Sequence, residues 1–161
     1  FAALERRYVY RMTDHPAGPD PMQRRMVAAM PKPLNIDLMN EAAEHLLGEH
    51  DFAAFCKKRD GATTIRTLLA LRTIRGGETI ATTVRADAFC HSMVRSLMGC
   101  LVAVGERRYE PEFAAEILSA QIRDPRVKVM PAHGLVLEEV VYPADDQLAA
   151  RVEEARSRRD E

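Results

Sequence analysis

Arg95 is the residue of this sequence whose chemistry is hardest to satisfy locally. It stands near the middle of residues 88–105, AFCHSMVRSLMGCLVAVG, which are apolar almost all the way round and predict a helix packed inside a core. A guanidinium group stays charged, so it needs a carboxylate or phosphate partner, yet no acidic residue lies between Phe89 and Val104. We expect Arg95 to hold and orient a carboxylate supplied by another segment, another chain or a ligand. The alternative is an arginine that caps loop carbonyls within the core.

Two tyrosines near the start of the chain form a second candidate site. Tyr8 and Tyr10 are two positions apart in a predicted strand, so their rings point the same way. Arg6 and Arg7 precede them and add positive charge beside the aromatic rings. This combination could hold a flipped-out base within a phosphate-binding rim. An ordinary half-buried strand would explain the same residues.

Positive charge is concentrated in one part of the chain although the net charge is only −1. Residues 56–85 carry two acidic residues, Asp60 and Glu78, and a larger set of basic ones: Lys57, Lys58, Arg59, Arg66, Arg72, Arg75 and Arg85. A basic stripe of this kind could contact nucleic acid. On charge alone, a solvated strand face explains it equally well.

Several classes of site have no signal in the sequence. The 161 residues contain no glycine-rich phosphate loop, no histidine or cysteine spacing typical of a metal site and no recognisable nucleophile motif. Cys56, Cys90 and Cys100 show no paired spacing and are expected to be reduced thiols. The longest apolar run is far too short to span a membrane.

Periodicity and turn signals predict an α+β fold. The expected strands are 6–12, 65–74, 79–86 and 135–142, and the expected helices are 35–47, 88–105, 111–120 and a charged helix or frayed tail from 145 onward. Gly76 and Gly77 indicate a hairpin between the second and third strands. We expect a mixed or antiparallel sheet with helices packed on one face, a cleft on the open face, and the strand 135–142 in a central position.

Four segments, in order, resemble the C-terminal half of the TruA family of tRNA pseudouridine synthases. FAALERRYVY at 1–10 is similar to the family's F-x-A-x-x-R-x-Y-x-Y strand, and LLGEHDFAAF at 46–55 is similar to its L-x-G-x-H-D-F-x-x-F segment. FCHSMVRSLMG at 89–99 resembles F-x-x-x-M-V-R-x-x-x-G, and PAHGLVLEEVVYP at 131–143 resembles P-A-x-G-L-x-L-x-x-V-x-Y-P. Four motifs in the family's order make the resemblance specific.

The resemblance implies a function and the roles of individual residues. The family isomerises uridine to pseudouridine in the anticodon arm of tRNA without a metal or cofactor, and usually as a homodimer. A location in the cytoplasm is expected from the reduced cysteines rather than from the resemblance. Tyr8 matches the tyrosine that stacks on the target base, Arg95 the arginine that pairs with the catalytic aspartate, and Leu135 the apolar residue that lines the pocket. By charge rather than by motif, the expected RNA-binding residues are Arg6, Arg7, Lys57, Lys58, Arg59 and Arg66.

One departure from the family concerns the nucleophile. The family's aspartate lies in a G-R-T-D-A-G-V-H segment upstream of the tyrosine strand, and nothing of that form occurs here. We therefore expect a truncated protein, inactive alone, whose missing N-terminal half supplies the carboxylate for Arg95. Residues 1–143 would form the C-terminal catalytic subdomain and 144–161 a charged helical tail. Two alternatives remain: a non-catalytic RNA-binding module, and a generic ligand-binding domain with its own carboxylate beside Arg95.

Overall fold

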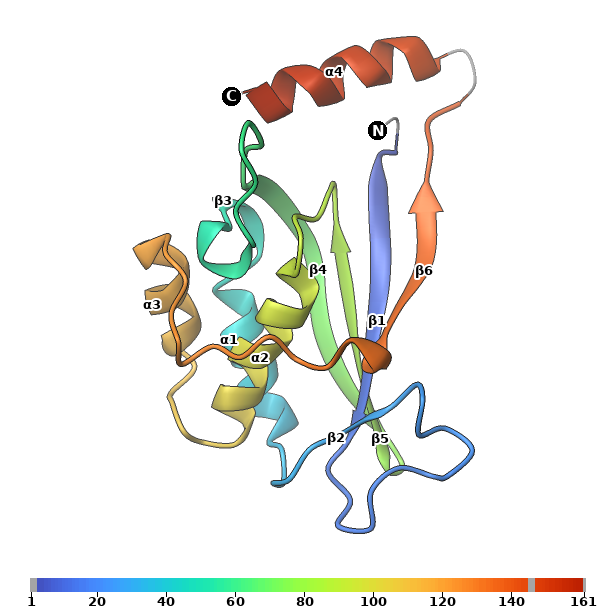
Figure 1. The fold of residues 1–161 in the computed structure, drawn as a ribbon, viewed down its shortest axis with the longest axis vertical. Helices are drawn as coiled ribbons and strands as arrows, with labels where there is room; N and C mark the ends of the chain where they lie inside the picture. The colour runs from blue at the N-terminus through green and yellow to red at the C-terminus, as the bar shows by residue number, and fades with distance from the viewer. Residues whose placement is uncertain (1–2, 145–146, 161) are drawn as a thin grey trace.

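The protein is built around one mixed sheet with helices packed on a single face, as expected (Figure 1). A computed structural model describes residues 3–144 and 147–160. Within these ranges the sheet has six strands in the order β2-β1-β5-β4-β3, and β6 pairs with β1. The strands are β1 (Glu5–Thr13), β2 (Ala28–Ala29), β3 (Gly48–Asp51), β4 (Ile65–Gly76), β5 (Thr79–Ala86) and β6 (Leu135–Val141).

Strand β1 organises the sheet because it has neighbours along both edges. One edge pairs antiparallel with β5, and the other pairs with β6 over residues 5–10 and with the short parallel strand β2 at Met12 and Thr13. The expectation that 135–142 is a central strand is wrong. Among the described residues β6 pairs only with β1, and Val136 and Leu137 are exposed. Its β-branched, apolar composition indicates a strand but does not distinguish a central position from an edge.

The helical layer consists of α1 (Ile36–Glu44), α2 (Met93–Gly105) and α3 (Phe113–Ala120). Asn35 caps α1 by accepting a hydrogen bond from the Leu38 amide at 2.9 Å. Side chains at helical spacing on α1, including Met39 and Ala42, then pack against the core. Asn40 bonds both backbone groups of Thr73 at 2.9 Å each, so α1 also closes the edge of β4 beyond the reach of β3.

Helix α2 lies at the centre of the core, and every one of its residues except Arg95 is buried. It begins at Met93 rather than at 88, because Ser92 adopts a left-handed backbone with φ of 67° and ends the preceding turn. Gly99 faces the backbone of Lys128 so closely that a Cβ atom would overlap the carbonyl oxygen. The segment before β6 therefore packs directly against α2.

A last helix, α4 (Leu148–Asp160), lies where we expected a charged helix or frayed tail from 145 onward; residues 145–146 and 161 of that stretch lie outside the described ranges. It crosses one end of the sheet (Figure 1). Arg151 of α4 is nearly buried and donates a hydrogen bond from Nη2 to the carbonyl oxygen of Ala3 at 3.2 Å. No helix in the described part of the chain is long and apolar enough to cross a membrane.

Candidate active site

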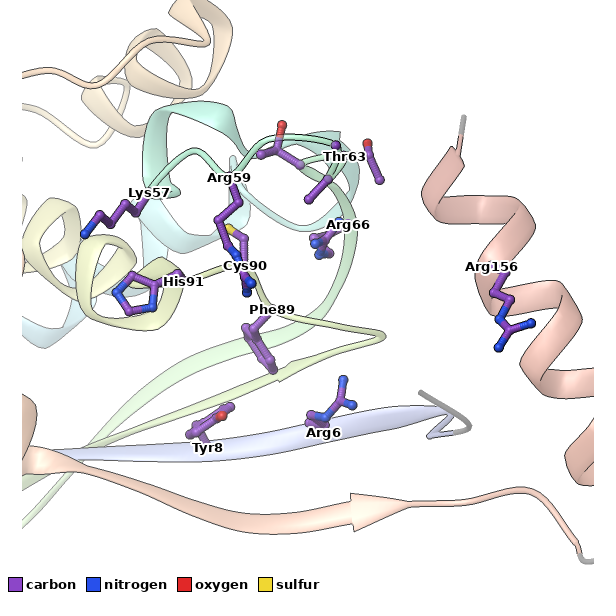
Figure 2. Close-up of a pocket in the computed structure, with 13 residues that line it drawn as sticks. Arg6, Tyr8, Lys57, Arg59, Thr63, Arg66, Phe89, Cys90, His91 and Arg156 are labelled. Carbon is purple, nitrogen blue, oxygen red and sulfur yellow. The ribbon is translucent and has the colours of Figure 1, made fainter.

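A cavity in the described structure lies beside β1, on the face that the helices cover, and not on the open face that we expected. Alternation along β1 puts Arg6, Tyr8 and the buried Tyr10 on one face of the sheet, and Tyr10 belongs to the helix-covered core. The cavity has a volume of about 810 Å³, which falls in the usual range for ligand sites. Figure 2 shows its lining side chains converging from β1, the segment before β4, the segment before α2, and α4.

The charge of the cavity lining has one sign. Its lining residues are Arg6, Tyr8, Lys57, Arg59, Gly61, Ala62, Thr63, Thr64, Arg66, Phe89, Cys90, His91 and Arg156. Five of them are lysine or arginine, and none of these described residues is aspartate or glutamate. A concave surface with several cations and no carboxylate favours a polyanionic ligand such as a nucleic-acid backbone.

Tyr8 supplies an aromatic surface within this basic cavity. Its ring meets the ring of Phe89 edge-on, with centroids 5.0 Å apart and an interplanar angle of 88°. This T-shaped contact is a favourable arrangement for two aromatic rings and fixes the orientation of Tyr8. The exposed part of the Tyr8 ring therefore offers a flat, oriented surface on which a base could stack.

Arg66 is the most deeply placed cation of the cavity. Its side chain is buried, and Nη1 donates a hydrogen bond to the carbonyl oxygen of Ile65 at 2.7 Å. Lys57 and Arg59 lie on the connection between β3 and β4, and both are exposed. The cations therefore reach from the floor of the cavity to its rim.

The sequence-predicted RNA-binding residues are brought together in part. Arg6, Lys57, Arg59 and Arg66 all line the cavity. Arg7 is not part of the lining, because it is one position out of phase with Arg6 and Tyr8 on β1. Lys58 is exposed but also lies outside the lining.

Arg95 lies outside the cavity lining and contacts the segment that precedes β6. Its Nε donates to the carbonyl oxygen of Met130 at 2.6 Å, so it does cap a loop carbonyl. No described residue forms an ion pair with Arg95, and its two terminal nitrogens have no hydrogen-bond partner among the described residues. The side chain is partly exposed. Arg95 therefore combines a structural contact with an unused pair of donors.

Tyr10 connects Arg95 with the other predicted residues. Its hydroxyl donates to the carbonyl oxygen of Pro131 at 2.7 Å. Burial raises the pKa of Tyr10 to about 12, and the positive charge of Arg95 opposes part of this rise. Leu135 pairs with Tyr10 across β6 and β1 and packs partly buried against the core. Because Tyr8 is two residues from Tyr10 on β1, Leu135 lies about 7 Å along the strand from the position of Tyr8.

The cysteine prediction is wrong. Cys56 and Cys90 form a disulfide with their Cα atoms 5.6 Å apart, and only the buried Cys100 is a free thiol. Cys90 was expected within a helix beginning at 88, but the later start of α2 leaves it in a turn that faces Cys56. The two residues are 34 positions apart, so no local spacing indicated the pair.

Some lining residues had no functional role assigned from the sequence. Phe89 was part of a motif but had no stated function, and Arg156 comes from the charged tail, to which no site role was assigned. His91 lies just before α2 and also lines the cavity. No group of three or more potential metal ligands occurs among the described residues.

Comparisons with known proteins match the chain to tRNA pseudouridine synthases. A profile of the family described as tRNA pseudouridine synthase matches residues 42–143. The chain is 56% identical over 159 residues to the tRNA pseudouridine synthase A of Streptomyces griseus subsp. griseus. It is 55% identical over 158 residues to the protein of the same name from Frankia casuarinae. Each of these two alignments covers 98% of this chain. It is 47% identical to the enzyme of that name from Corynebacterium glutamicum over 165 residues.

The α+β domain contains a cavity lined by basic side chains and an aromatic ring. Such a cavity suits a protein that modifies RNA. With these matches, the chain belongs to the tRNA pseudouridine synthase family. It spans only between 56% and 58% of the length of these relatives.

Proposed function

We propose that this chain forms the tRNA-binding wall of the active site in a tRNA pseudouridine synthase that acts on the anticodon arm. The observation that carries the proposal is the cavity lining, which combines five cations and no described carboxylate with an oriented tyrosine ring. Arg6, Lys57, Arg59 and Arg66 would contact phosphates, and Arg7 and Lys58 would add to the positive field around them.

The reaction is an isomerisation in which the N-glycosidic bond of a uridine breaks, the base turns, and a carbon–carbon glycosidic bond forms. In our proposal the Tyr8 ring stacks on the target base and Leu135 provides an apolar wall near Tyr10. The terminal nitrogens of Arg95 hold the nucleophilic carboxylate ionised and in a fixed orientation. No described residue supplies that carboxylate to Arg95, so we propose that it comes from a segment outside residues 1–161.

The organisation of the whole protein follows from this assignment as part of the proposal. Residues 1–143 are the C-terminal catalytic subdomain, and the charged tail 144–161 adds Arg156 to the cavity. The complete enzyme includes an N-terminal half, acts as a homodimer in the cytoplasm, and uses no metal or organic cofactor. The isolated chain of 161 residues would bind tRNA but would not isomerise uridine.

A salt-dependent binding experiment tests the nucleic-acid assignment on the chain itself. Affinity for an unmodified tRNA transcript should fall steeply with salt, and Arg6→Gln should reduce the slope of log K against log salt by about 1. Arg123→Gln is the matched control because Arg123 is exposed and lies outside the cavity lining. Equal slopes for the wild type and Arg6→Gln would show that Arg6 does not contact an RNA phosphate.

A non-catalytic RNA-binding module is the second candidate, supported by the missing partner of Arg95. Both candidates predict tRNA binding, so isomerisation must separate them. The full-length polypeptide should release the proton from C5 of uridine in tRNA if it is a synthase. Tight binding without any release would favour the binding module.

A further inference from the structure

The Cys56–Cys90 disulfide lies in the wall of the basic cavity, where the proposed isomerisation has no use for it. Cys90 lines the cavity and is partly buried, whereas Cys56 is only 1% exposed and packs in the core. Each sulfur therefore has a different environment, and an attacking reagent can reach Cys90 from the cavity side. Figure 2 shows Cys90 behind Arg59 and between Phe89 and His91.

The disulfide fixes one end of the cavity rim, residues 57–64. Immediately after Cys56, the Lys57 amide donates to the carbonyl oxygen of His91 at 2.9 Å, which joins the same two segments. At the other end of the rim, the Thr64 hydroxyl donates to Oδ1 of Asp51 at 2.5 Å. Between these ends the described backbone contributes one turn hydrogen bond, from Ala62 to Arg59, at 3.3 Å.

We propose that the Cys56–Cys90 pair is a reversible thiol–disulfide exchange site for low-molecular-weight thiols, and that its oxidation state sets the affinity of the cavity for RNA. The second half of this statement rests on the proposed function. In the reducing cytoplasm where we place the protein, disulfides are usually transient and redox-sensing rather than structural.

The exchange balances as a two-electron reaction. A thiolate of the small thiol attacks Sγ of Cys90, forms a mixed disulfide there, and releases Cys56 as a thiolate that takes up a proton. A second molecule of the small thiol attacks the mixed disulfide, which frees Cys90 as a thiol and leaves as the oxidised small disulfide. Two small thiols are thus oxidised to one disulfide, and the protein gains two thiols.

Reduction would weaken RNA binding because residues 57–64 of the rim would become less ordered. Without the disulfide, Lys57 stays attached to the turn before α2 by one backbone hydrogen bond, so Lys57 and Arg59 sample more positions. Binding RNA must then order them, and that entropy opposes association. By linkage, RNA that prefers the oxidised form must also stabilise the disulfide against reduction.

The first experiment needs no RNA. Hydrogen exchange of residues 57–64 is compared in the oxidised chain and after treatment with reduced glutathione, with thiol states verified by alkylation and mass spectrometry. We expect faster exchange in 57–64 after reduction and in the Cys56→Ala/Cys90→Ala double variant. Cys100→Ala is the matched control, since Cys100 is buried and unpaired, and it should keep the redox response. Unchanged exchange in a fully reduced chain would refute the role of the disulfide in ordering the rim.

The second experiment measures the Kd of an unmodified tRNA transcript in both redox states. We expect binding about 5-fold or more weaker after reduction, and equally weak in the double variant whatever the redox buffer. Saturating tRNA should shift the glutathione ratio at which half of the disulfide is reduced. Equal Kd values in both states would overturn the switch while leaving the proposed function intact. Undetectable binding in both states would overturn the proposed function and its link to the disulfide together.

Discussion

Arg95 and Met130 exchange two hydrogen bonds, one through a side chain and one through the backbone. Nε of Arg95 donates to the carbonyl oxygen of Met130 at 2.6 Å, and the Met130 amide donates to the carbonyl oxygen of Arg95 at 3.1 Å. The guanidinium plane is therefore anchored by one edge, and its two terminal nitrogens remain available. A guanidinium held in this way is preorganised for a carboxylate that approaches from outside the described chain.

Replacing Arg95 tests both its contact with Met130 and its proposed role in orienting the carboxylate. Arg95→Lys keeps the charge but loses the planar donor to Met130, and Arg95→Ala loses both. We expect the turnover of the full-length enzyme to fall about 100-fold or more in both variants, because a carboxylate loses its oriented donors. The chain should also lose about 1.5–3 kcal/mol of unfolding free energy, measured in urea, because the charged hydrogen bond to Met130 is gone.

The affinity of these Arg95 variants for tRNA provides the internal control. Arg95 is not part of the cavity lining, so the Kd for a tRNA transcript should change less than the turnover does. Normal isomerisation by Arg95→Ala, measured as proton release from C5 of uridine, would defeat the assignment of this residue.

Gly99→Ala tests the close packing that holds Met130 in place. A Cβ at position 99 would overlap the carbonyl oxygen of Lys128, which is backbone and cannot rotate away. An alanine in a helix interior normally stabilises a protein by about 1 kcal/mol relative to glycine. Here the overlap with Lys128 opposes that gain and determines whether the substitution raises or lowers the unfolding free energy. We expect Gly99→Ala to lower the unfolding free energy by about 3 kcal/mol or more in urea titrations.

Gly76→Ala is the matched control for this substitution. A Cβ at Gly76 would meet nothing within 4 Å, and its backbone φ lies outside the left-handed region. Its unfolding free energy should stay within about 0.5 kcal/mol of the wild type. A Gly99→Ala protein as stable as Gly76→Ala would show that the segment before β6 can move away from α2 at little cost.

The sequence predicts those parts of the fold whose signals are local. The Gly76-Gly77 turn places β4 and β5 correctly, and the expected helix 35–47 contains α1. Strand β3 was not expected, because the residues Gly48–Asp51 have little β-propensity and gain their partner only from β4. The position of β6 at an edge depends on what pairs with β1, which no local pattern contains.

The candidate site was predictable to the extent that motifs carried it. Tyr8 and Arg95 were identified from strand and helix patterns together with the family resemblance, and the structure adds what surrounds them. The disulfide and the place of His91 in the cavity wall both follow from one backbone feature, the left-handed Ser92 that delays the start of α2. A non-glycine residue with positive φ is uncommon and has no reliable sequence signal.

The ion pair between Asp14 and Arg75 should make stability depend on pH in the acid range. Oδ1 and Oδ2 of Asp14 accept from Arg75 at 2.8 and 2.9 Å. Hydrogen bonding to Arg75 lowers the pKa of Asp14 from 3.8 to about 2. A carboxyl whose pKa is lowered on folding stabilises the protein above its unfolded pKa, and this stabilisation is lost as the pH falls from about 4 towards 2.

Asp14→Asn isolates this contribution. At pH 7 we expect it to lower the unfolding free energy by about 1–2 kcal/mol, less than the full pKa shift implies, because Arg75 is 38% exposed and screened by solvent. The difference from the wild type should shrink as the pH approaches 2. Asp60→Asn, at an exposed site, should follow the wild-type curve throughout. A constant difference between Asp14→Asn and the wild type from pH 7 to pH 2 would exclude titration of Asp14 as its source.

Tyr8 allows the ring and the hydroxyl to be tested separately, because Phe89 contacts the ring. Tyr8→Phe keeps the edge-on contact and the stacking surface, so tRNA binding by the chain should stay within about twofold. Tyr8→Ala removes the stacking surface and should weaken binding about 5- to 100-fold, since stacking of one base contributes about 1–3 kcal/mol. Phe89→Leu removes the contact that orients the ring, worth about 0.5–1.5 kcal/mol, and should fall between them.

Tyr142→Ala is the control for these variants, because Tyr142 is an exposed tyrosine outside the cavity lining. Its tRNA affinity, measured by fluorescence anisotropy beside the others, should match the wild type. In the full-length enzyme Tyr8→Phe should still lower turnover if the hydroxyl takes part in the reaction. Removal of this one oxygen atom would then lower turnover while leaving the tRNA affinity nearly unchanged. If Tyr8→Phe and Tyr8→Ala instead weaken binding equally, the hydroxyl rather than the ring holds the RNA, and the edge-on contact with Phe89 does not serve base stacking.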